Sequence, residues 1–208
     1  MVRSMHHREE KQQKRNRMIL GILITVIMIG STIGYFVGQQ NSNNNGLEYK
    51  AKNGNIYSFD QVNGKLYTTI NGKGLSFYSH PLDAMQLNIS DDAIRLINDS
   101  QIVLLTFDPQ NNNDIQYIEQ SRFDMENDFA GLKKYLITGV EKNTSGYESF
   151  KTITCKNSTA QVPVIEFVSS NSTETRGYVN NSCIIFEGKR TDFLKFRDYI
   201  VYKLYGVI

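Results

Sequence analysis

Residues 101–107 read QIVLLTF, a continuous apolar run between polar turn residues. Such a run is typical of a strand that lies inside a sheet and is covered on both faces. Asp108 and Pro109 follow directly and end the strand, because proline has no N–H group to donate to a sheet. We therefore expect residues 101–107 to form a central strand of the fold.

The residues after this strand repeat with the period of a helix. Apolar side chains recur there, with charged side chains between them, at Ile115, Ile118, Met125, Phe129 and Leu132. This spacing predicts an amphipathic helix. A second apolar run, YLITGV at residues 135–140, predicts another strand. Strand, helix and strand at this length predict a βαβ unit, with parallel pairing and a right-handed crossover.

The C-terminal third continues with short strands and a last helix. We expect strands at residues 150–155 and 162–168, a hairpin of residues 175–179 and 183–186, and a helix over residues 192–205. Thr191 and Gly206 are of the residue types that begin and end helices. With a short helix at residues 91–98, these elements predict an α/β or α+β domain over residues 81–208.

Residues 47–80 carry signals of β-structure only. Asn-Gly pairs stand at residues 53–54, 63–64 and 71–72, each between alternating apolar and polar side chains. Asn-Gly is the strongest short hairpin signal, because both central residues of a type I′ turn need positive φ. The segment therefore predicts a small antiparallel β-meander of four strands.

Residues 18–38, MILGILITVIMIGSTIGYFVG, contain no charged side chain. A helix of this length, at about 1.5 Å per residue, matches the hydrocarbon core of a bilayer, which is about 30 Å thick. The sequence thus predicts one N-terminal transmembrane helix. A cleaved signal peptide is the alternative, but the run is longer than a signal core and no A-x-A site follows it.

The charges beside this segment predict its orientation. Residues 1–17 hold six Lys and Arg side chains, whereas residues 39–46 are uncharged and polar. By the positive-inside rule, residues 1–17 are a cytoplasmic arm in a single-pass protein of the cell membrane. Residues 39–46 are expected to be a flexible stalk, and the C-terminal domain to be extracytoplasmic.

Three glycines in the apolar segment fall on one helix face, at Gly30, Gly34 and Gly38. This doubled G-x-x-x-G pattern favours close helix packing and a homodimer through the span. The alternative is that the pattern has no such role, because glycine is common in membrane helices.

Cys155 and Cys183 are the two cysteines of the chain. An oxidising exterior and an even count favour a disulfide between them. A redox pair and a metal site are the alternatives. The first usually needs C-x-x-C, which is absent, and a structural zinc site normally needs four N or S ligands. We expect no metal and no cofactor.

Six N-x-Ser/Thr sequons follow the expected membrane span. The candidate glycosylation sites are Asn88, Asn143, Asn157, Asn171 and Asn180. Asn98 begins the sixth sequon, and we expect it to be the least reachable of the six because a buried strand follows. Glycosylation of some of these residues would agree with an extracytoplasmic domain.

Asp108 lies just past the C-terminal end of an apolar strand, where open α/β sheets bind their ligands. Asn111 and Asp114 follow closely and complete a candidate ligand site, which would bind a hard cation through oxygen. The alternative is an Asp-Pro turn followed by a polar loop. No calcium-loop spacing supports the site.

Other catalytic signals are sparse. His80 is the one histidine after the apolar segment, and no G-x-S-x-G motif accompanies it. Glu166 and Glu187 lie on expected strands, and only their residue type suggests a glycosidase pair. No Gly-rich phosphate loop or dinucleotide motif is present. We therefore assign no catalytic residue from the sequence.

A loose pattern covers about half of the chain, at its C-terminal end. Its residues are Thr154, Cys155, Asn157, VPVI at 162–165, CIIFEG at 183–188 and LYGVI at 204–208. The pattern resembles a group of small, single-pass, membrane-anchored proteins of archaea. That group has no assigned activity, so the resemblance implies topology and compartment and no chemistry.

The charge balance limits the partners. The chain has 23 Lys and Arg against 21 Asp and Glu, and six of the basic residues lie in the arm. The remainder is slightly acidic, which argues against nucleic-acid binding. We expect a non-catalytic binding or assembly domain that acts with the lipid bilayer and other envelope proteins. The alternatives are a hydrolase that uses Asp108 or Glu187 and, more weakly supported, a thiol oxidoreductase that uses Cys155 and Cys183.

Overall fold

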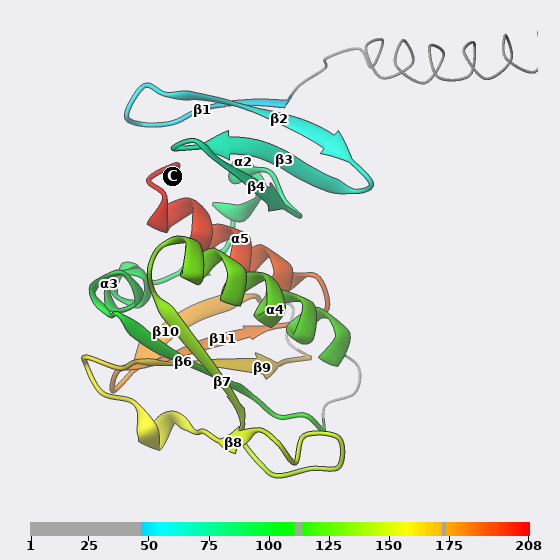
Figure 1. The fold of residues 1–208 in the computed structure, drawn as a ribbon, viewed down its shortest axis with the longest axis vertical. Coiled ribbons are helices and arrows are strands. Elements are labelled where there is room, and N and C mark those ends of the chain that lie inside the picture. The colour runs from blue at the N-terminus through cyan, green and yellow to red at the C-terminus, as the bar shows by residue number, and fades with distance from the viewer. Residues whose placement is uncertain (1–46, 111–113, 172–173) are drawn as a thin grey trace, which may run out of the picture. The chain divides into compact units, whose positions relative to one another are not determined.

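The computed structural model of the chain describes residues 47–110, 114–171 and 174–208 (Figure 1). The chain divides into two compact units, residues 1–45 and 46–208, and the described residues belong to the second. They form an α+β domain with two sheets. The expected arm, span and stalk, and with them Gly30, Gly34 and Gly38, lie outside the described residues.

The fold class predicted from the sequence was wrong in one component, the membrane-spanning helix. Among residues 47–110, 114–171 and 174–208, no helix is long and apolar enough to cross a bilayer. The longest described helix has 17 residues, and these include Glu119, Arg122 and Asp124. The fold that the structure supports is an α+β domain of two sheets and four described helices.

The smaller sheet has four antiparallel strands in the order β1-β2-β3-β4. They are β1 (Leu47–Lys50), β2 (Ile56–Val62), β3 (Lys65–Ile70) and β4 (Lys73–Phe77). Asn63 and Gly64, and likewise Asn71 and Gly72, have positive φ, as a type I′ hairpin turn requires. At the remaining Asn-Gly pair only Gly54 has positive φ, so the turn between β1 and β2 is of another kind.

The two hairpins of this sheet separate away from the turn between β2 and β3 (Figure 1). Pairing of these strands is confined to residues 60–62 and 65–67. Beyond them lies a hollow of about 450 Å³, lined by Tyr57, Asp60, Tyr67 and neighbouring side chains. The small sheet is therefore continuous only close to this turn.

The larger sheet has seven strands in the order β5-β10-β11-β9-β6-β7-β8. They are β5 (Asn88–Ile89), β6 (Ile102–Phe107), β7 (Tyr135–Val140), β8 (Lys151–Thr152), β9 (Val164–Ser169), β10 (Arg176–Asn180) and β11 (Cys183–Gly188). Neighbours pair in parallel, except β10 and β11, which form a hairpin. The chain adds β7 on one side of β6 and β9 on the other, so the winding of the sheet reverses at β6.

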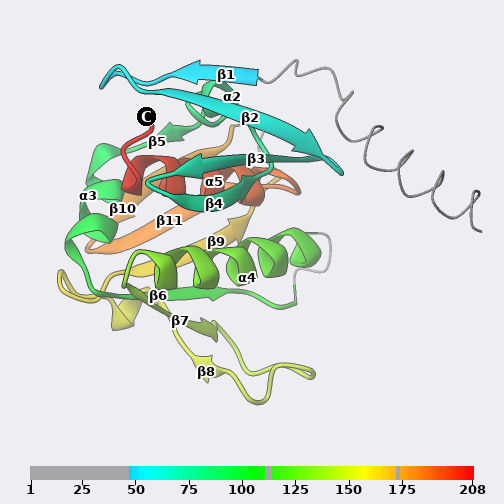
Figure 2. The same ribbon diagram turned by 45° about the horizontal axis from the view of Figure 1, so that its top comes forward.

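Helices α4 (Ile115–Gly131) and α5 (Asp192–Leu204) lie between the two sheets in both views (Figures 1 and 2). Tyr202 of α5 stacks on Phe77 of β4, with ring centroids 4.1 Å apart. Phe196 of α5 stacks on Phe186 of β11 at 4.4 Å. The shorter helices α2 (Pro81–Ala84) and α3 (Asp91–Asp99) follow the small sheet in the chain. α5 therefore packs against both sheets.

The strand expected at residues 150–155 is mostly replaced by other structure. Only Lys151–Thr152 pair with β7, as β8. A 3₁₀ turn, η1 (Cys155–Asn157), follows. The backbone N–H of Thr154 donates to Oδ1 of Asn157 at 2.8 Å. This local hydrogen bond satisfies the backbone in a turn and removes the need for a strand partner.

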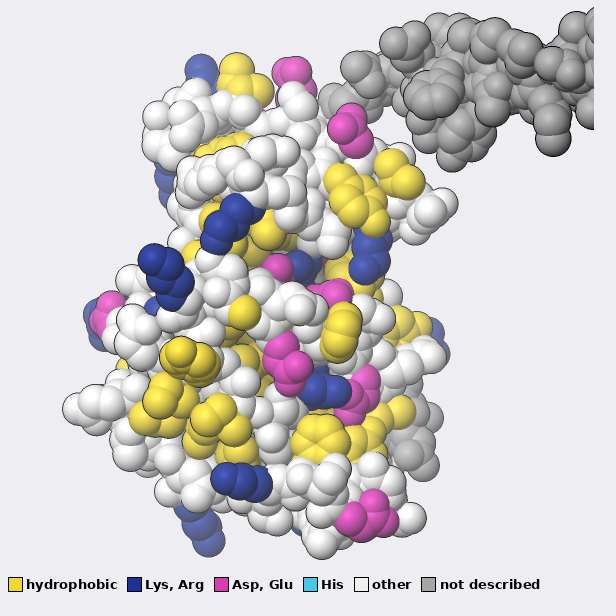
Figure 3. Space-filling model, in the orientation of Figure 1, with side chains coloured by type: hydrophobic (Ala, Val, Ile, Leu, Met, Phe, Trp, Pro, Cys, Tyr) yellow, Lys and Arg dark blue, Asp and Glu magenta, His cyan; other side chains and the backbone are white. Residues whose placement is uncertain are grey.

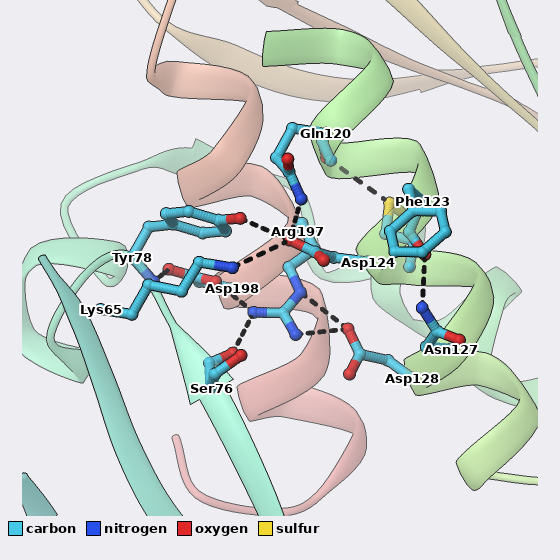
Figure 4. Close-up of polar contacts among 12 residues, drawn as sticks. Lys65, Ser76, Tyr78, Gln120, Phe123, Asp124, Asn127, Asp128, Arg197 and Asp198 are labelled. Atoms are coloured by element: carbon cyan, nitrogen blue, oxygen red, sulfur yellow. Dashed lines mark hydrogen bonds and ion pairs between the residues drawn. The ribbon is translucent and has the colours of Figure 1, made fainter. Parts of the chain in front are cut away.

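Arg197, Asp128 and Asp198 form a buried ion cluster between α4, α5 and the small sheet (Figure 4). Arg197 donates Nε to Oδ2 of Asp128 and Nη1 to Oδ1 of Asp198, both at 2.7 Å. It also donates Nη1 to the carbonyl oxygen of Ser76 in β4 at 2.5 Å. The three charged side chains are 8% exposed or less. Such deep burial of charge is tolerated only when each charge is paired.

Asp198 also accepts hydrogen bonds from the segment that follows β4. Its Oδ2 accepts from the backbone N–H groups of Tyr78 and Ser79, at 2.8 and 2.7 Å, and from the Ser79 hydroxyl at 2.9 Å. Burial raises the pKa of Asp198 to about 6, against the opposing effects of Arg197 and these donors. Hydrogen bonds to a carboxylate are stronger than neutral ones, so the cluster fixes the small sheet firmly to α5.

We expect Arg197→Met to lower the free energy of unfolding by about 3–5 kcal/mol, because it leaves two buried carboxylates without their cation. The control is Arg176→Met, which removes an ion pair with Glu187 whose arginine side chain is 52% exposed. It should lower the free energy of unfolding far less, because exposed ion pairs contribute little to stability. Urea unfolding followed by tyrosine fluorescence measures both, since the chain has 12 Tyr and no Trp. If both variants lost the same free energy of unfolding, the buried cluster would contribute no more to stability than the exposed ion pair.

Candidate functional site

A hollow of about 240 Å³ opens at the C-terminal ends of three neighbouring strands of the large sheet. Asp108 follows β6, Glu141 follows β7, and Glu166 lies in β9, and all three line this space. We call it the carboxylate hollow. It lies where the winding of the sheet reverses, and open α/β sheets bind ligands at such points. The carboxylate hollow is therefore the first candidate for a ligand site.

The alternation of side chains along a strand brings the three carboxylates to one face. In β9, Phe167 packs in the main core beneath the helices, so its neighbour Glu166 points to the opposite face. Asp108 and Glu141 each follow a strand residue that is buried in the same core. All three acidic side chains consequently meet on the side of the sheet that faces away from α4 and α5.

Crowding of like charges changes the proton affinity of Glu141. Burial, a hydrogen bond with Glu166 and the negative charges of Glu166 and Asp108 raise the pKa of Glu141 to about 7. Lys142 opposes this shift, but its side chain is 63% exposed and its Nζ lies 3.5 Å from Oδ2 of Asp108. Glu141 therefore keeps a proton near neutral pH, because neighbouring negative charge favours the neutral form of a carboxyl group.

The predicted disulfide between Cys155 and Cys183 is present, with a sequence separation of 28. Cys155 begins η1 and is half-buried, whereas Cys183 begins β11 and is fully buried. On the chain-entropy model, closing a loop of this length stabilises the folded state by about 3–4 kcal/mol. The bond ties the segment before β9 to the strand on the far side of β9.

The disulfide borders the carboxylate hollow. Oε2 of Glu166 lies 2.6 Å from Sγ of Cys155 and 3.8 Å from Sγ of Cys183. The carboxylate oxygen and the two sulfurs all lie within 4.8 Å of one another, a spacing that would suit a metal ion if both thiols were free. A metal ligand must be a thiolate, so these sulfurs are not ligands while they form the disulfide.

The other members of the predicted ligand set do not join Asp108. Asp114 is buried, and its Oδ1 accepts from the backbone N–H of Arg190 at 2.7 Å. It therefore connects the start of α4 to the loop before α5. Asn111 lies outside the described residues.

Glu187 and His80, both weighed as catalytic residues, have structural partners. Glu187 accepts from Arg176 at 2.7 Å and from the Tyr178 hydroxyl at 2.8 Å. Both bonds lower the pKa of Glu187, which makes it a poor general acid. His80 caps α2 by accepting from the N–H of Leu82 at 3.4 Å, and burial lowers the pKa of its ring.

The asparagines of all six sequons are exposed, namely Asn88, Asn98, Asn143, Asn157, Asn171 and Asn180. Asn98, which we expected to be the least reachable, is exposed like the others. Asn98 lies on the solvent side of α3, before the buried strand begins. Exposure makes each asparagine accessible to a glycosylating enzyme.

Glu141 is the residue that the sequence analysis missed. It is the first residue after β7, just as Asp108 is the first residue after β6. This positional signal was present in the sequence. The contact of Glu166 with the disulfide had no such signal, because it depends on the order of strands in the sheet.

Exposed apolar side chains are spread over several parts of the surface. The face shown in Figure 3 carries them in separate groups, with acidic and basic side chains between. The most exposed ones come from four different elements, namely Ile56, Leu82, Phe123 and Tyr135. The carboxylate hollow, rather than one dominant apolar patch on that face, is therefore the feature that needs a functional explanation.

Comparisons with known proteins add no assignment. No protein-family model, curated protein or solved structure matches the chain. The resemblance to archaeal membrane-anchored proteins stays a prediction, and the function has to be argued from geometry.

We expect the stability of the protein to fall as the pH rises from 4.5 to 7. The pKa of Glu141 in the folded state, about 7, exceeds its ordinary value of 4.5, so the folded protein holds an extra proton in this range. Glu141→Gln removes the titrating group and with it this dependence of stability on pH. The variant should be as stable as the wild type at pH 5 and more stable by about 1 kcal/mol at pH 8, allowing for partial exposure of the group.

Urea unfolding at the two pH values measures this difference. The matched control is Glu148→Gln, which changes an exposed glutamate outside the carboxylate hollow. The control should show the same small difference from wild type at both pH values. If Glu141→Gln were no more stable than the wild type at pH 8, the pKa of Glu141 would not be raised in solution, and the crowding of the carboxylates would be contradicted.

Proposed function

We propose that the described domain is a non-catalytic binding domain of an extracytoplasmic compartment, and that it binds the positively charged part of a ligand in the carboxylate hollow. One observation carries this proposal. Three carboxylates, two that directly follow β6 and β7 and one within β9, face a single space of about 240 Å³, and their crowding keeps a proton on Glu141 near neutral pH.

A bound cation would relieve this crowding. An opposite charge within a few ångströms favours the ionised form of each carboxyl group. Each ionised carboxylate offers two oxygen atoms as acceptors. The exposed Lys142 contacts Asp108 alone among the three, so Glu141 and Glu166 would gain most from a positive ligand.

Two features support the extracytoplasmic location. A disulfide such as Cys155–Cys183 persists in oxidising compartments and is rare in the cytosol. The six sequon asparagines are exposed, so a glycosylating enzyme would reach them without unfolding the domain.

Isothermal titration calorimetry with CaCl₂ and, separately, with spermidine tests the proposal at pH 6.5 and low salt. We expect one of the two to bind with a Kd of about 1 mM or lower. Binding should release up to one proton, because the cation displaces the proton that Glu141 holds. The proton count follows from the heats in two buffers of different ionisation enthalpy. The probe that binds shows whether the ligand charge is that of a metal ion or of an amine.

Variants of the hollow make the test specific. Asp108→Asn and Glu166→Gln should each weaken binding at least about tenfold, which corresponds to roughly 1.4 kcal/mol. Glu148→Gln should bind as the wild type does, because Glu148 does not line the hollow. The proposal is overturned if neither probe binds, or if the variant with all three acids neutralised binds as well as the wild type.

One observation favours a second candidate, a hydrolase. Glu141 keeps a proton near neutral pH while it is hydrogen-bonded to Glu166. Such a pair can act as general acid and general base on either side of a water molecule. Glu141 and Glu166 thereby replace Asp108 and Glu187, which the sequence suggested as the acid.

A screen of chromogenic esters and glycosides tests the hydrolase. Activity that Glu141→Gln lowers at least about 100-fold would support it, since general acid–base groups contribute factors of this size. Glu187→Gln, whose carboxylate is held by Arg176 and Tyr178, should keep full activity. If the wild type turned over none of these substrates faster than buffer does, the hydrolase would be dropped.

A further inference from the structure

The small sheet is open between its two central strands. β2 and β3 pair from Asp60 and Tyr67 to the turn at residues 63–64, and no further. Beyond that pair the two hairpins separate (Figures 1 and 2), and residues of both line the hollow of about 450 Å³. We call this hollow the strand gap. Its volume lies in the range of ligand sites, about 300–1,000 Å³.

Backbone groups without a strand partner border the strand gap. Along an antiparallel strand, residues that exchange hydrogen bonds with one neighbouring strand alternate with residues that face the other. Val62 and Lys65 flank the two-residue turn and form a bonded pair between β2 and β3. In steps of two residues, the N–H and C=O groups of Ser58 therefore also face β3, and those of Thr69 face β2. Neither residue is paired across the gap.

The alternate residues have their partners on the sides away from the gap. The N–H of Ala51 donates to the carbonyl oxygen of Asn55 at 2.8 Å, so Tyr57, two residues further along β2, bonds to β1. Ile70 flanks the next two-residue turn, so Thr68 bonds to β4. Each hairpin is thus complete in itself and unpaired on the edge that faces the gap.

An extended polypeptide backbone is the partner that fits two such edges. Its N–H and C=O groups point to both sides at the spacing of a strand. Addition of an extended peptide to an exposed strand edge is a common mode of recognition. In the strand gap one added strand pairs on both sides, with Ser58 on one side and Thr69 on the other. The recognition is therefore mainly of the peptide backbone.

Asp60 determines which part of a polypeptide fits. Because β2 and β3 pair directly from Asp60 and Tyr67 onward, an inserted strand has to end or turn away there. Asp60 is exposed, and it is the one charged residue among those that line the gap. None of the ion pairs between described residues involves it. A positive α-amino end suits this position, whereas a negative carboxyl end does not.

We propose that the strand gap binds the unblocked N-terminal segment of a partner polypeptide as an inserted strand, with its α-amino group at Asp60. The bound segment runs away from Asp60, so it is antiparallel to β2 and parallel to β3. About four of its residues enter, because the unpaired stretches are residues 56–59 and 68–70.

The side chains around the gap favour apolar and β-branched residues in the bound segment. Ile56 and Tyr67 are 62% and 42% exposed and border the gap on the outer face of the sheet. Tyr57 and Leu75 line it as well and are half-buried. A strand with apolar side chains on both faces would cover these four residues.

The experiment titrates the full-length protein with fluorescein-labelled hexapeptides at pH 6.5, where an α-amino group is protonated. The set holds every combination of Ala, Val, Thr and Tyr at the first four positions, with the label at the C-terminal end. Each peptide is made with a free and with an acetylated amino end. Fluorescence polarisation should show members that bind with a Kd of about 100 μM or lower, and acetylation should weaken them at least about tenfold. The inference is overturned if no member binds, or if acetylated peptides bind as well.

Asp60→Asn tests the contact with the amino group. The variant should bind the free peptides at least about tenfold more weakly and should no longer distinguish them from the acetylated ones, because both changes remove the same interaction. Asp83→Asn, which changes an exposed acid of α2 outside the gap, should bind as the wild type does. If Asp60→Asn kept its preference for free amino ends, or if Asp108→Asn lost binding instead, the peptide would lie elsewhere and the inference would fail.

Hydrogen exchange followed by NMR tests the inserted strand. Saturating peptide should slow exchange at the amides of Ser58 and Thr69 at least about tenfold, because these groups gain partners. The amides of Tyr57 and Thr68, already bonded to β1 and β4, should change far less. Binding without protection of Ser58 and Thr69 would exclude strand insertion. If the free protein were a dimer with these two amides already protected, a second copy would occupy the gap, and the inference would again be overturned.

The two binding proposals can be judged separately. Cation binding is measured with CaCl₂ and spermidine at the carboxylate hollow, whereas peptide binding depends on Asp60 and on backbone groups of the small sheet. Either proposal can therefore fail while the other stands.

Discussion

The guanidinium of Arg197 lies between α4, α5 and the last strand of the small sheet. One cation faces two buried carboxylates there, so ion pairing alone cannot satisfy the cluster. The remaining acceptor capacity of Asp198 is used by backbone N–H groups of the segment after β4. Aromatic packing between Phe77 and Tyr202 could tolerate sliding of the small sheet over α5, whereas these directed bonds fix its position.

Strand β9 connects the acidic residues of the hollow with the disulfide. It lies between β6 and β11 in the sheet, so Glu166 at its centre reaches acidic residues on one side and the disulfide on the other. The face that carries Glu166 is the one that α4 and α5 do not cover. A different strand order would have separated the carboxyl groups from the sulfurs. The topology of the sheet thus brings the acidic side chains and the disulfide together.

Local signals in the sequence predicted many of the strands, helices and turns. The features that could not be predicted depend on contacts between residues far apart in the chain. The Asn-Gly pairs at 63–64 and 71–72 specify their turns because the need for positive φ is local. The disulfide followed from the count of cysteines, but its surroundings did not. Arg197 interrupts an apolar stripe on α5 and would be read as solvent-facing. Its burial depends on partners 69 and 121 residues away. The transmembrane helix of the predicted fold class has no counterpart among the described residues.

The position of α5 at the end of the chain affects the order in which the domain folds during synthesis. Every described strand of both sheets precedes α5 in the sequence, so a ribosome completes all of them before it makes the helix that they pack against. Until then Phe77 and Phe186, fully buried in the finished fold, lack Tyr202 and Phe196, the α5 side chains that stack on them. The contacts of both sheets with α5 therefore form only after the last strand has been made.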